Sequence, residues 1–245
     1  MAKPNIRLGA TAAPSAAIDA GLRTYMLRVY NYMTVGTAIT GLTAWLVANT
    51  PLINLFYNTT QDGFLTPSLL GWAAVISPLI FILAMSFGLN KMKASTIQML
   101  FWAVTIVFGI SLSNILLTFT GTSVARVFFI TAGLFGAMSL YGYTTKRDLT
   151  KLGSFLFMGL IGIILASVVN IFIGSSMMQF VISVAGVLIF TGLTAYDTQK
   201  IKEMNILGNE GTEEDTKEAI RGALTLYLDF INLFLMLLRI MGTRR

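Results

Sequence analysis

The stretch Leu152–Ile173, LGSFLFMGLIGIILASVVNIFI, decides the fold class because it runs for 22 residues without a charge. A membrane-spanning helix needs about 20 mostly apolar residues, since the hydrocarbon core is roughly 30 Å thick and a helix rises about 1.5 Å per residue. These runs are too continuous for amphipathic soluble helices, which would show a polar face, and we therefore expect an all-α polytopic membrane protein with seven transmembrane helices. The six other runs of this kind are Val29–Ala48, Pro67–Leu89, Ile97–Phe119, Val124–Tyr143, Met177–Tyr196 and Gly222–Met241.

The composition of the 245-residue chain supports the same class. Hydrophobic residues make up 55% of the chain and charged residues only 11%, with a mean hydropathy of +0.75. A soluble domain typically carries about a quarter charged residues. Histidine and cysteine are both absent, which excludes disulfide scaffolds, Cys/His zinc sites, thiol nucleophiles and Ser-His-Asp triads. Any group that gains or loses a proton in function must then be a carboxylate, an amine, a tyrosine or water.

The net charge of +6 is distributed as a topology signal, so we expect no nucleic-acid partner. Basic residues gather in alternate connections, whereas the opposite connections hold only Arg126, at the edge of a run. This asymmetry predicts a cytoplasmic N-terminus, with residues 1–24 as a tail and residues 25–245 as the seven-helix domain. The residues on the predicted cytoplasmic side are Lys3, Arg7, Arg23, Arg28, Lys91, Lys93, Lys146, Arg147, Lys151, Lys200, Lys202, Lys217 and Arg221.

The last run disagrees with this rule, because a full seventh crossing places Arg239, Arg244 and Arg245 on the outside. Either the seventh helix spans against a weak local signal, or it re-enters and leaves the C-terminus inside. We favour spanning, since earlier helices usually dominate orientation.

Two of the eleven acidic residues fall within apolar runs rather than in tails or loops. Asp197 closes the sixth run, and Asp229 lies well inside the seventh. A charge at bilayer depth costs about 2.5–3.5 kcal/mol on insertion scales, so such a residue is a functional-site hypothesis by default. The alternative for Asp229 is a neutral, hydrogen-bonded acid that holds helices together. Asp197 taken alone, beside Lys200, is typical of an interfacial residue.

Three asparagines interrupt the apolar runs as well. Asn232 lies one turn beyond Asp229 on the same helix face, Asn114 interrupts the third run, and Asn170 interrupts the fifth. They are candidates for the lining of a hydrophilic path. Each can equally be an ordinary hydrogen-bonding residue between helices.

The acidic segment before the last run predicts a helix start rather than a calcium site. Thr212 followed three residues later by Asp215 resembles a capping arrangement. The segment lacks the alternating ligand register of a calcium-binding loop.

Two stretches together resemble the Bax inhibitor family, also called the transmembrane Bax inhibitor motif family. One is AYDTQKI at Ala195–Ile201, followed downstream by LYLDFINLF at Leu226–Phe234. The other is FGAMSLYGYTTKRDL at Phe135–Leu149. The resemblance covers nearly the whole chain from about Thr24 onward.

The resemblance implies a fold in which six helices surround the last one, and a pH-sensitive calcium leak across the membrane. It also implies that Asp197 and Asp229 form a paired pH sensor that gates the pore. Calcium is then the permeant ion, and it contacts the two aspartates transiently. An additional acid of the human member, one turn before the second aspartate, is replaced here by Thr225. The short N-terminal tail and the lack of an organelle signal resemble bacterial members of the family, which implies a location in the inner membrane.

A close carboxylate pair supplies the expected mechanism. Two carboxylates in a poorly solvated site cannot both ionise cheaply, so they share a proton and can titrate near neutral pH without histidine. Loss of that proton exchanges a hydrogen bond for repulsion and leaves a pair that attracts a divalent cation.

Other functions remain open from the sequence. A proton-coupled calcium exchanger could use the same pair. A non-conducting regulator could bind a membrane protease or stress and cell-death partners instead. An intramembrane aspartyl protease fits poorly, because the Gly-x-Gly-Asp motif is replaced by Leu226, Tyr227 and Leu228 before Asp229. We therefore expect no enzyme activity and no cofactor.

Overall fold

Helices make up most of the computed structural model, which describes residues 15–59, 65–88, 91–204 and 211–245. Most of the predicted N-terminal tail, residues 1–14, and the first part of the acidic segment lie outside these ranges. Helix α1 begins at Ser15, within the segment predicted as tail. The elements are α1 (Ser15–Ala48), α2 (Ile53–Phe56), β1 (Tyr57–Thr59), β2 (Leu65–Pro67), α3 (Leu69–Gly88), α4 (Ala94–Thr118), α5 (Gly121–Thr144), α6 (Thr150–Ile173), α7 (Ser176–Met204) and α8 (Glu213–Met241).

Each predicted apolar run falls on a long helix, which confirms the all-α class. Five of the described helices, α4 to α8, are long and apolar enough to cross a membrane. Helix α3 contributes a shorter apolar stretch, Leu69–Met85, and α1 mixes apolar with polar residues. The small antiparallel hairpin of β1 and β2, in which Tyr57 pairs with Pro67, was not predicted.

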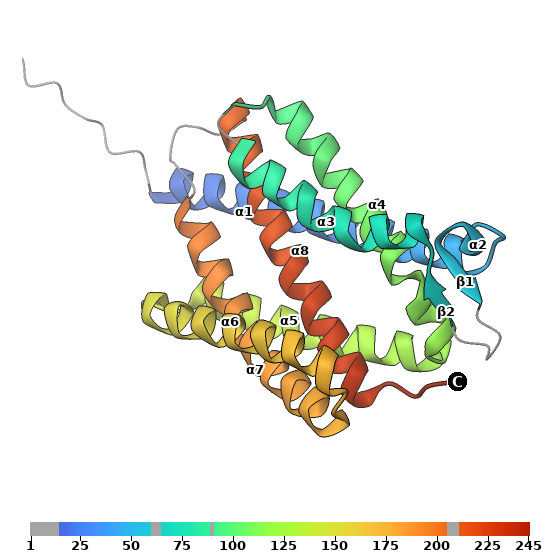
Figure 1. Cartoon of the computed structure of the whole chain (residues 1–245). Helices are drawn as coiled ribbons and strands as arrows, with labels where there is room; N and C mark the ends of the chain where they lie inside the picture. Colours follow the sequence, from blue (N-terminus) through green and yellow to red (C-terminus); the bar gives the residue numbers. More distant parts are fainter. Residues whose placement is uncertain (1–14, 60–64, 89–90, 205–210) are drawn as a thin grey trace, which may run out of the picture.

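The long helices form two groups, with α8 between them (Figure 1). Helices α1, α3 and α4 pack together in one group, and α5, α6 and α7 pack together in the other. Helix α8 packs against α1 and α4 of the first group and against α5 and α7 of the second. The last helix therefore occupies the core of the described bundle.

Aromatic rings fix α8 to both groups. Tyr227 meets the rings of Phe101 and Phe108 on α4, with centroids 6.3 and 5.7 Å away. Phe230, one turn later, meets Phe128 and Phe135 on α5 at 5.5 and 5.6 Å. Edge-on aromatic pairs of this kind hold their helices at a defined rotation.

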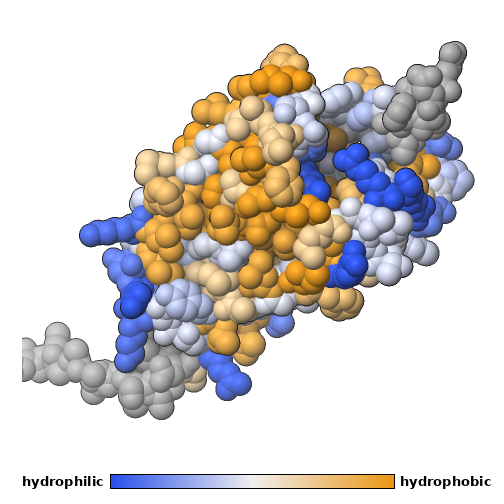
Figure 2. Space-filling view, turned by 90° about the horizontal axis from the view of Figure 1, so that it is seen from below, coloured by the Kyte–Doolittle hydropathy of each residue, from blue (hydrophilic) through white to orange (hydrophobic). Residues whose placement is uncertain are grey.

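The outer surface is apolar over a broad area, as Figure 2 shows for one face. Large side chains such as Phe172 and Ile171 on α6 are mostly exposed. Hydrophilic residues gather toward the ends of the molecule in this view. A surface of this kind suits lipid contact, because lipid tails solvate apolar side chains as well as a protein interior does.

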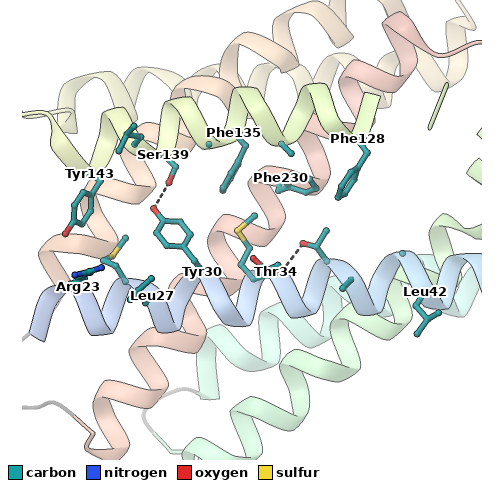
Figure 3. A pocket seen from close by; sticks show the side chains of 18 residues that line it. Arg23, Leu27, Tyr30, Thr34, Leu42, Phe128, Phe135, Ser139, Tyr143 and Phe230 are labelled. Carbon is teal, nitrogen blue, oxygen red and sulfur yellow. Dashed lines mark hydrogen bonds between the residues drawn. The ribbon is translucent and has the colours of Figure 1, made fainter. Parts of the chain in front are cut away.

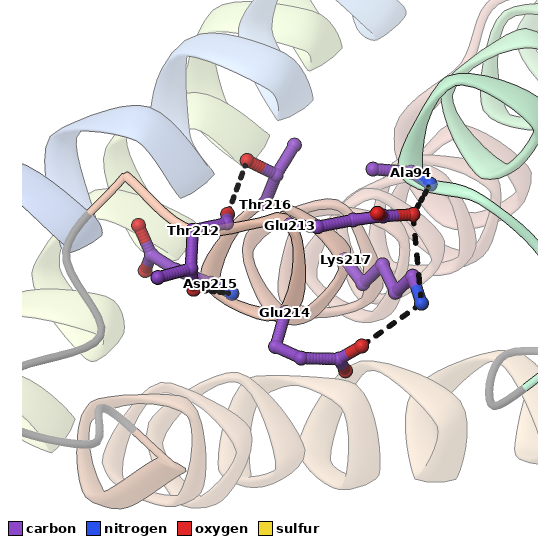
Figure 4. A network of polar contacts seen from close by, with 7 residues as sticks. All are labelled: Ala94, Thr212, Glu213, Glu214, Asp215, Thr216 and Lys217. Atoms are coloured by element: carbon purple, nitrogen blue, oxygen red, sulfur yellow. Dashed lines mark hydrogen bonds and ion pairs between the residues drawn. The ribbon is translucent and has the colours of Figure 1, made fainter.

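The two ends of the bundle are chemically distinct. At the end where α8 begins, Thr212 caps the helix by accepting a hydrogen bond from the Asp215 backbone N–H at 3.2 Å, which confirms the predicted cap. In the same network, Glu213 accepts a hydrogen bond from the Ala94 backbone N–H at the start of α4, and Lys217 forms an ion pair with Glu214 at 2.9 Å (Figure 4). The start of α8 is thus tied to the start of α4.

At the other end, the residues after α8 pair with the α4–α5 connection. The backbone N–H of Thr120 donates to the carbonyl of Thr243, and that of Arg245 donates to Thr118. Helix α8 is continuous over its 29 residues and does not turn back. A continuous helix of this length and composition is long and apolar enough to cross a membrane.

Candidate functional site

Helix α7 extends past the apolar run that predicted it, and this changes the position of Asp197. The run ends at Tyr196, whereas the helix continues to Met204. The extension is held by Lys202, whose Nζ donates to the carbonyl oxygen of Tyr143 at the end of α5, 2.9 Å away. Asp197 therefore lies inside the helix rather than at its end.

The structure brings Asp197 of α7 and Asp229 of α8 together. Their carboxyl groups lie within hydrogen-bonding reach of each other, and the residues are only 8% and 5% exposed. Neither carboxyl forms an ion pair with a basic residue in the described part of the chain. The Oδ2 atom of Asp229 is buried and accepts no hydrogen bond from the described residues. A proton shared between the two groups would remove repulsion that a fully ionised pair must bear.

A chain of hydroxyl groups begins beside the pair. Thr198, which follows Asp197, donates to the carbonyl of Thr194 and shares a 3.0 Å hydrogen bond with Ser139 of α5. Ser139 in turn shares a 2.6 Å hydrogen bond with the Tyr30 hydroxyl of α1. These contacts connect α7, α5 and α1 at the level of the carboxylates, and they were not predicted from the sequence.

The Tyr-Asp-Thr-Gln element also anchors the connection between α5 and α6. The Gln199 amide accepts from the Leu149 backbone N–H at 2.9 Å and donates to the Arg147 carbonyl at 2.8 Å. Gly142 of α5 packs so closely on the backbone of Ala195 that a β-carbon would overlap it. The two stretches that carry the family resemblance therefore pack directly against each other.

On the other side of α8, a second buried cluster fixes the helix. The Tyr227 hydroxyl shares a 2.7 Å hydrogen bond with the hydroxyl of Thr40 on α1. The Thr40 hydroxyl also donates to the carbonyl oxygen of Thr105 on α4, 2.8 Å away. All three residues are buried. This cluster lies two residues from Asp229 in the sequence and holds α8 against the first helix group.

The three candidate asparagines are placed differently. Asn232 donates to the Leu228 carbonyl of its own helix at 2.8 Å, and Asn114 is half-buried in α4. Asn170 accepts from the Ser175 backbone N–H at the α6–α7 turn. Asp197 lies 21 residues after the start of α7 at Ser176, about 30 Å along the helix, so Asn170 is not brought to the carboxylates.

The carboxylate pair offers few ligands for a resident metal. In the described residues, no group of three or more His, Cys, Asp or Glu side chains could hold an ion. Calcium takes six to eight oxygen ligands, as a rule. Two carboxylates alone supply fewer ligands than a resident calcium ion takes.

Comparison with known proteins identifies the same family that the sequence motifs resemble. Residues 22–245 match the family described as "Inhibitor of apoptosis-promoting Bax1". The chain is 48% identical over 227 residues to the inner membrane protein YbhL of Escherichia coli, covering 92% of this chain and 94% of that one. An uncharacterized protein of Rickettsia prowazekii is 48% identical over 237 residues, with 96% of each chain covered. A protein of Borreliella burgdorferi is 42% identical over 221 residues, covering 90% of this chain and 92% of that one.

Proposed function

Because the chain belongs to the Bax inhibitor family and is an integral membrane protein, we propose that it is a pH-sensitive calcium leak channel gated by Asp197 and Asp229. The observation that carries the proposal is the contact between these two buried carboxyl groups, one from α7 and one from α8. They lie 32 residues apart in the sequence and meet at α8, the most buried of the five candidate spans.

The proposal includes a membrane topology. Helices α1 and α3 are taken as the two spans additional to α4–α8, which gives seven spans with α8 in the middle. The N-terminus is taken to be cytoplasmic, because the connections rich in Lys and Arg then all face the cytoplasm. By analogy with the Escherichia coli relative, the membrane is the bacterial inner membrane.

The proposed gate acts through the α7–α8 contact. With one proton between them, Asp197 and Asp229 hold the two helices together by a hydrogen bond. When the proton leaves, two negative charges face each other, and neither has an ion pair among the described residues; Lys200, one turn after Asp197, is near enough to attract the Asp197 carboxylate. The repulsion shifts α8 relative to α7, and the ionised pair attracts a hydrated divalent cation.

Calcium flux into dye-loaded proteoliposomes tests this function, measured from about pH 5 to pH 8. We expect a flux that changes with pH in the wild type, and a flux without that titration in Asp197→Asn and Asp229→Asn. The matched control is Asp148→Asn, because Asp148 lies in the α5–α6 connection, outside the pair, and an amide oxygen there can still accept from Thr150. This control should keep the wild-type pH profile.

An imposed proton gradient separates the leak from a proton-coupled exchanger. A leak follows the calcium gradient, whereas an exchanger moves calcium against it when protons flow the other way. Absence of flux at every pH in folded protein would overturn the channel proposal and leave a non-conducting regulator as the better account.

A further inference from the structure

A long groove separates α1 from α5 on the side of the bundle (Figure 3). Its volume is about 1120 Å³, and Phe230 of α8 lines it between the two helices. Most of the lining is apolar and includes Leu27, Leu42, Phe128 and Phe135. Although α1 and α5 belong to different helix groups, Tyr30 and Ser139 join them by one hydrogen bond across the groove.

The groove has the dimensions of a lipid site. Its lining on α1 runs from Arg23 to Leu42, and the 19 helical steps between them correspond to about 28 Å of helix. One leaflet contributes about half of a hydrocarbon core that is roughly 30 Å thick. The groove can therefore hold one extended acyl chain and still reach a headgroup.

The lining of the groove carries a charged residue at only one end. Arg23 and Tyr143 line the end near the start of α1, and Leu42 and Phe128 line the other (Figure 3). The neighbouring Arg28 pairs with Asp215 at 2.7 Å, whereas exposed Arg23 forms no ion pair within the described ranges. An unpaired guanidinium at the mouth of an apolar groove matches a phosphate on an acyl chain.

We propose that this groove binds an anionic phospholipid, with one acyl chain between α1 and α5 and its phosphate at Arg23. The middle of the groove suits a chain because Tyr30 and Ser139 satisfy each other's hydroxyl groups. Gly41 and Gly136 leave open space where a side chain would stand on α1 and α5. The groove lies outside the Asp197–Asp229 pair, although Tyr30 and Ser139 belong both to its lining and to the hydroxyl chain beside the pair, and the proposal goes beyond the proposed function.

Native mass spectrometry of the delipidated protein tests the site with phosphatidylglycerol and phosphatidylcholine of identical chains. We expect one tightly bound lipid and an apparent affinity about five-fold higher for phosphatidylglycerol, the ratio that corresponds to about 1 kcal/mol for one basic side chain near an anionic headgroup. Arg23→Gln should remove this preference while the acyl chain still binds. Equal binding of the two lipids by the wild type would overturn the proposal.

A matched pair of glycines on α5 separates this site from general lipid contact. Gly136 lines the groove and Gly133 does not, and both are exposed positions with open space around an added side chain. Gly136→Leu should remove the tightly bound lipid, whereas Gly133→Leu should retain it. Ala38→Leu blocks the groove from α1 and replaces Gly136→Leu if that variant does not elute as folded protein. Equal lipid binding by the blocking variant and Gly133→Leu would overturn the proposal.

Discussion

Helices α6 and α8 show that hydropathy and burial are separate properties in this protein. Helix α6 has the most apolar stretch of the five candidate spans, yet only 11% of that stretch is buried. The corresponding stretch of α8 is less apolar and 56% buried. Among the residues of α6, only Gly153 and Leu156 are buried, whereas α8 buries Asp229 together with apolar residues along its length.

The difference follows from the solvent around the helices. In water, the most apolar helix gains most from the interior, but lipid tails offer no such gain because they are as apolar as leucine. Polar groups then gain most from the interior, since they cannot be hydrated by lipid. Helix α8 carries Asp229 and Tyr227 and takes the centre, while α6 faces outward.

The largest expected effect compares the same truncation in both helices. Leu226→Ala in α8 removes a fully buried side chain and should lower the free energy of unfolding by about 2–5 kcal/mol, because the packed site cannot close on the cavity. Leu165→Ala in α6, where the residue is 61% exposed, should change it by less than about 0.5 kcal/mol. Reversible unfolding in bicelles measures both. Equal losses would show that α6 is buried in an assembly.

Glycine replacements test the comparison in the opposite direction. A β-carbon at Gly222 of α8 would lie 2.9 Å from the Ile201 side chain, so Gly222→Leu should cost about 1–3 kcal/mol by overpacking. A β-carbon at Gly162 of α6 meets no described atom within 4 Å, so Gly162→Leu should be neutral or slightly stabilising. Thermal unfolding in detergent ranks the two variants. A destabilised Gly162→Leu would contradict the outward placement of α6.

The sequence predicted the positions of the long helices, but not their ends or their burial. Apolar runs predicted the long helices well, because a spanning helix must satisfy its own backbone in lipid. They predicted helix ends less well, as α7 shows: the apolar run ends at Tyr196, whereas the helix continues to Met204, and the Lys202 amine in this extension donates to the Tyr143 carbonyl. Hydropathy could not rank α6 and α8 by burial.

The candidate site was predictable in part for a similar reason. The cost of a carboxylate in lipid singled out Asp229, but spacing alone could not pair it with Asp197, and that pairing came from the family resemblance. The hydroxyl chain of Thr198, Ser139 and Tyr30 gave no signal, because Ser and Thr in such helices usually bond their own backbone. The roles of the two aspartates stay predictions until flux is measured.

A smaller effect separates hydrogen bonds between helices from those within one helix. Tyr227→Phe in α8 keeps the ring contacts but removes the bond to Thr40, and should cost about 0.6–1 kcal/mol. Ser167→Ala in α6 removes a bond only to the Ile163 carbonyl of the same helix and should cost almost nothing. Unfolding in bicelles again gives the two values. A loss at Ser167 as large as at Tyr227 would argue against α8 being held more firmly than α6.

The smallest effect concerns the two helix starts and depends on pH. Thr212 caps α8 with a hydroxyl that does not titrate, whereas the Asp148 carboxylate accepts from the Thr150 backbone N–H at 2.8 Å at the start of α6. Hydrogen bonds from Thr150 lower the pKa of Asp148 below its ordinary value of 3.8. The stabilisation is therefore complete above about pH 4 and is lost as the pH falls through the lowered pKa.

Asp148→Ala should then be slightly less stable than the wild type near neutral pH, and the difference should shrink in acid. Thr212→Ala should show a difference that does not follow the titration of Asp148, because its capping hydroxyl stays neutral. Thermal unfolding from about pH 7 down to about pH 2.5 compares the two variants. A difference for Asp148→Ala that stays constant below pH 4 would mean that this carboxylate does not hold the start of α6.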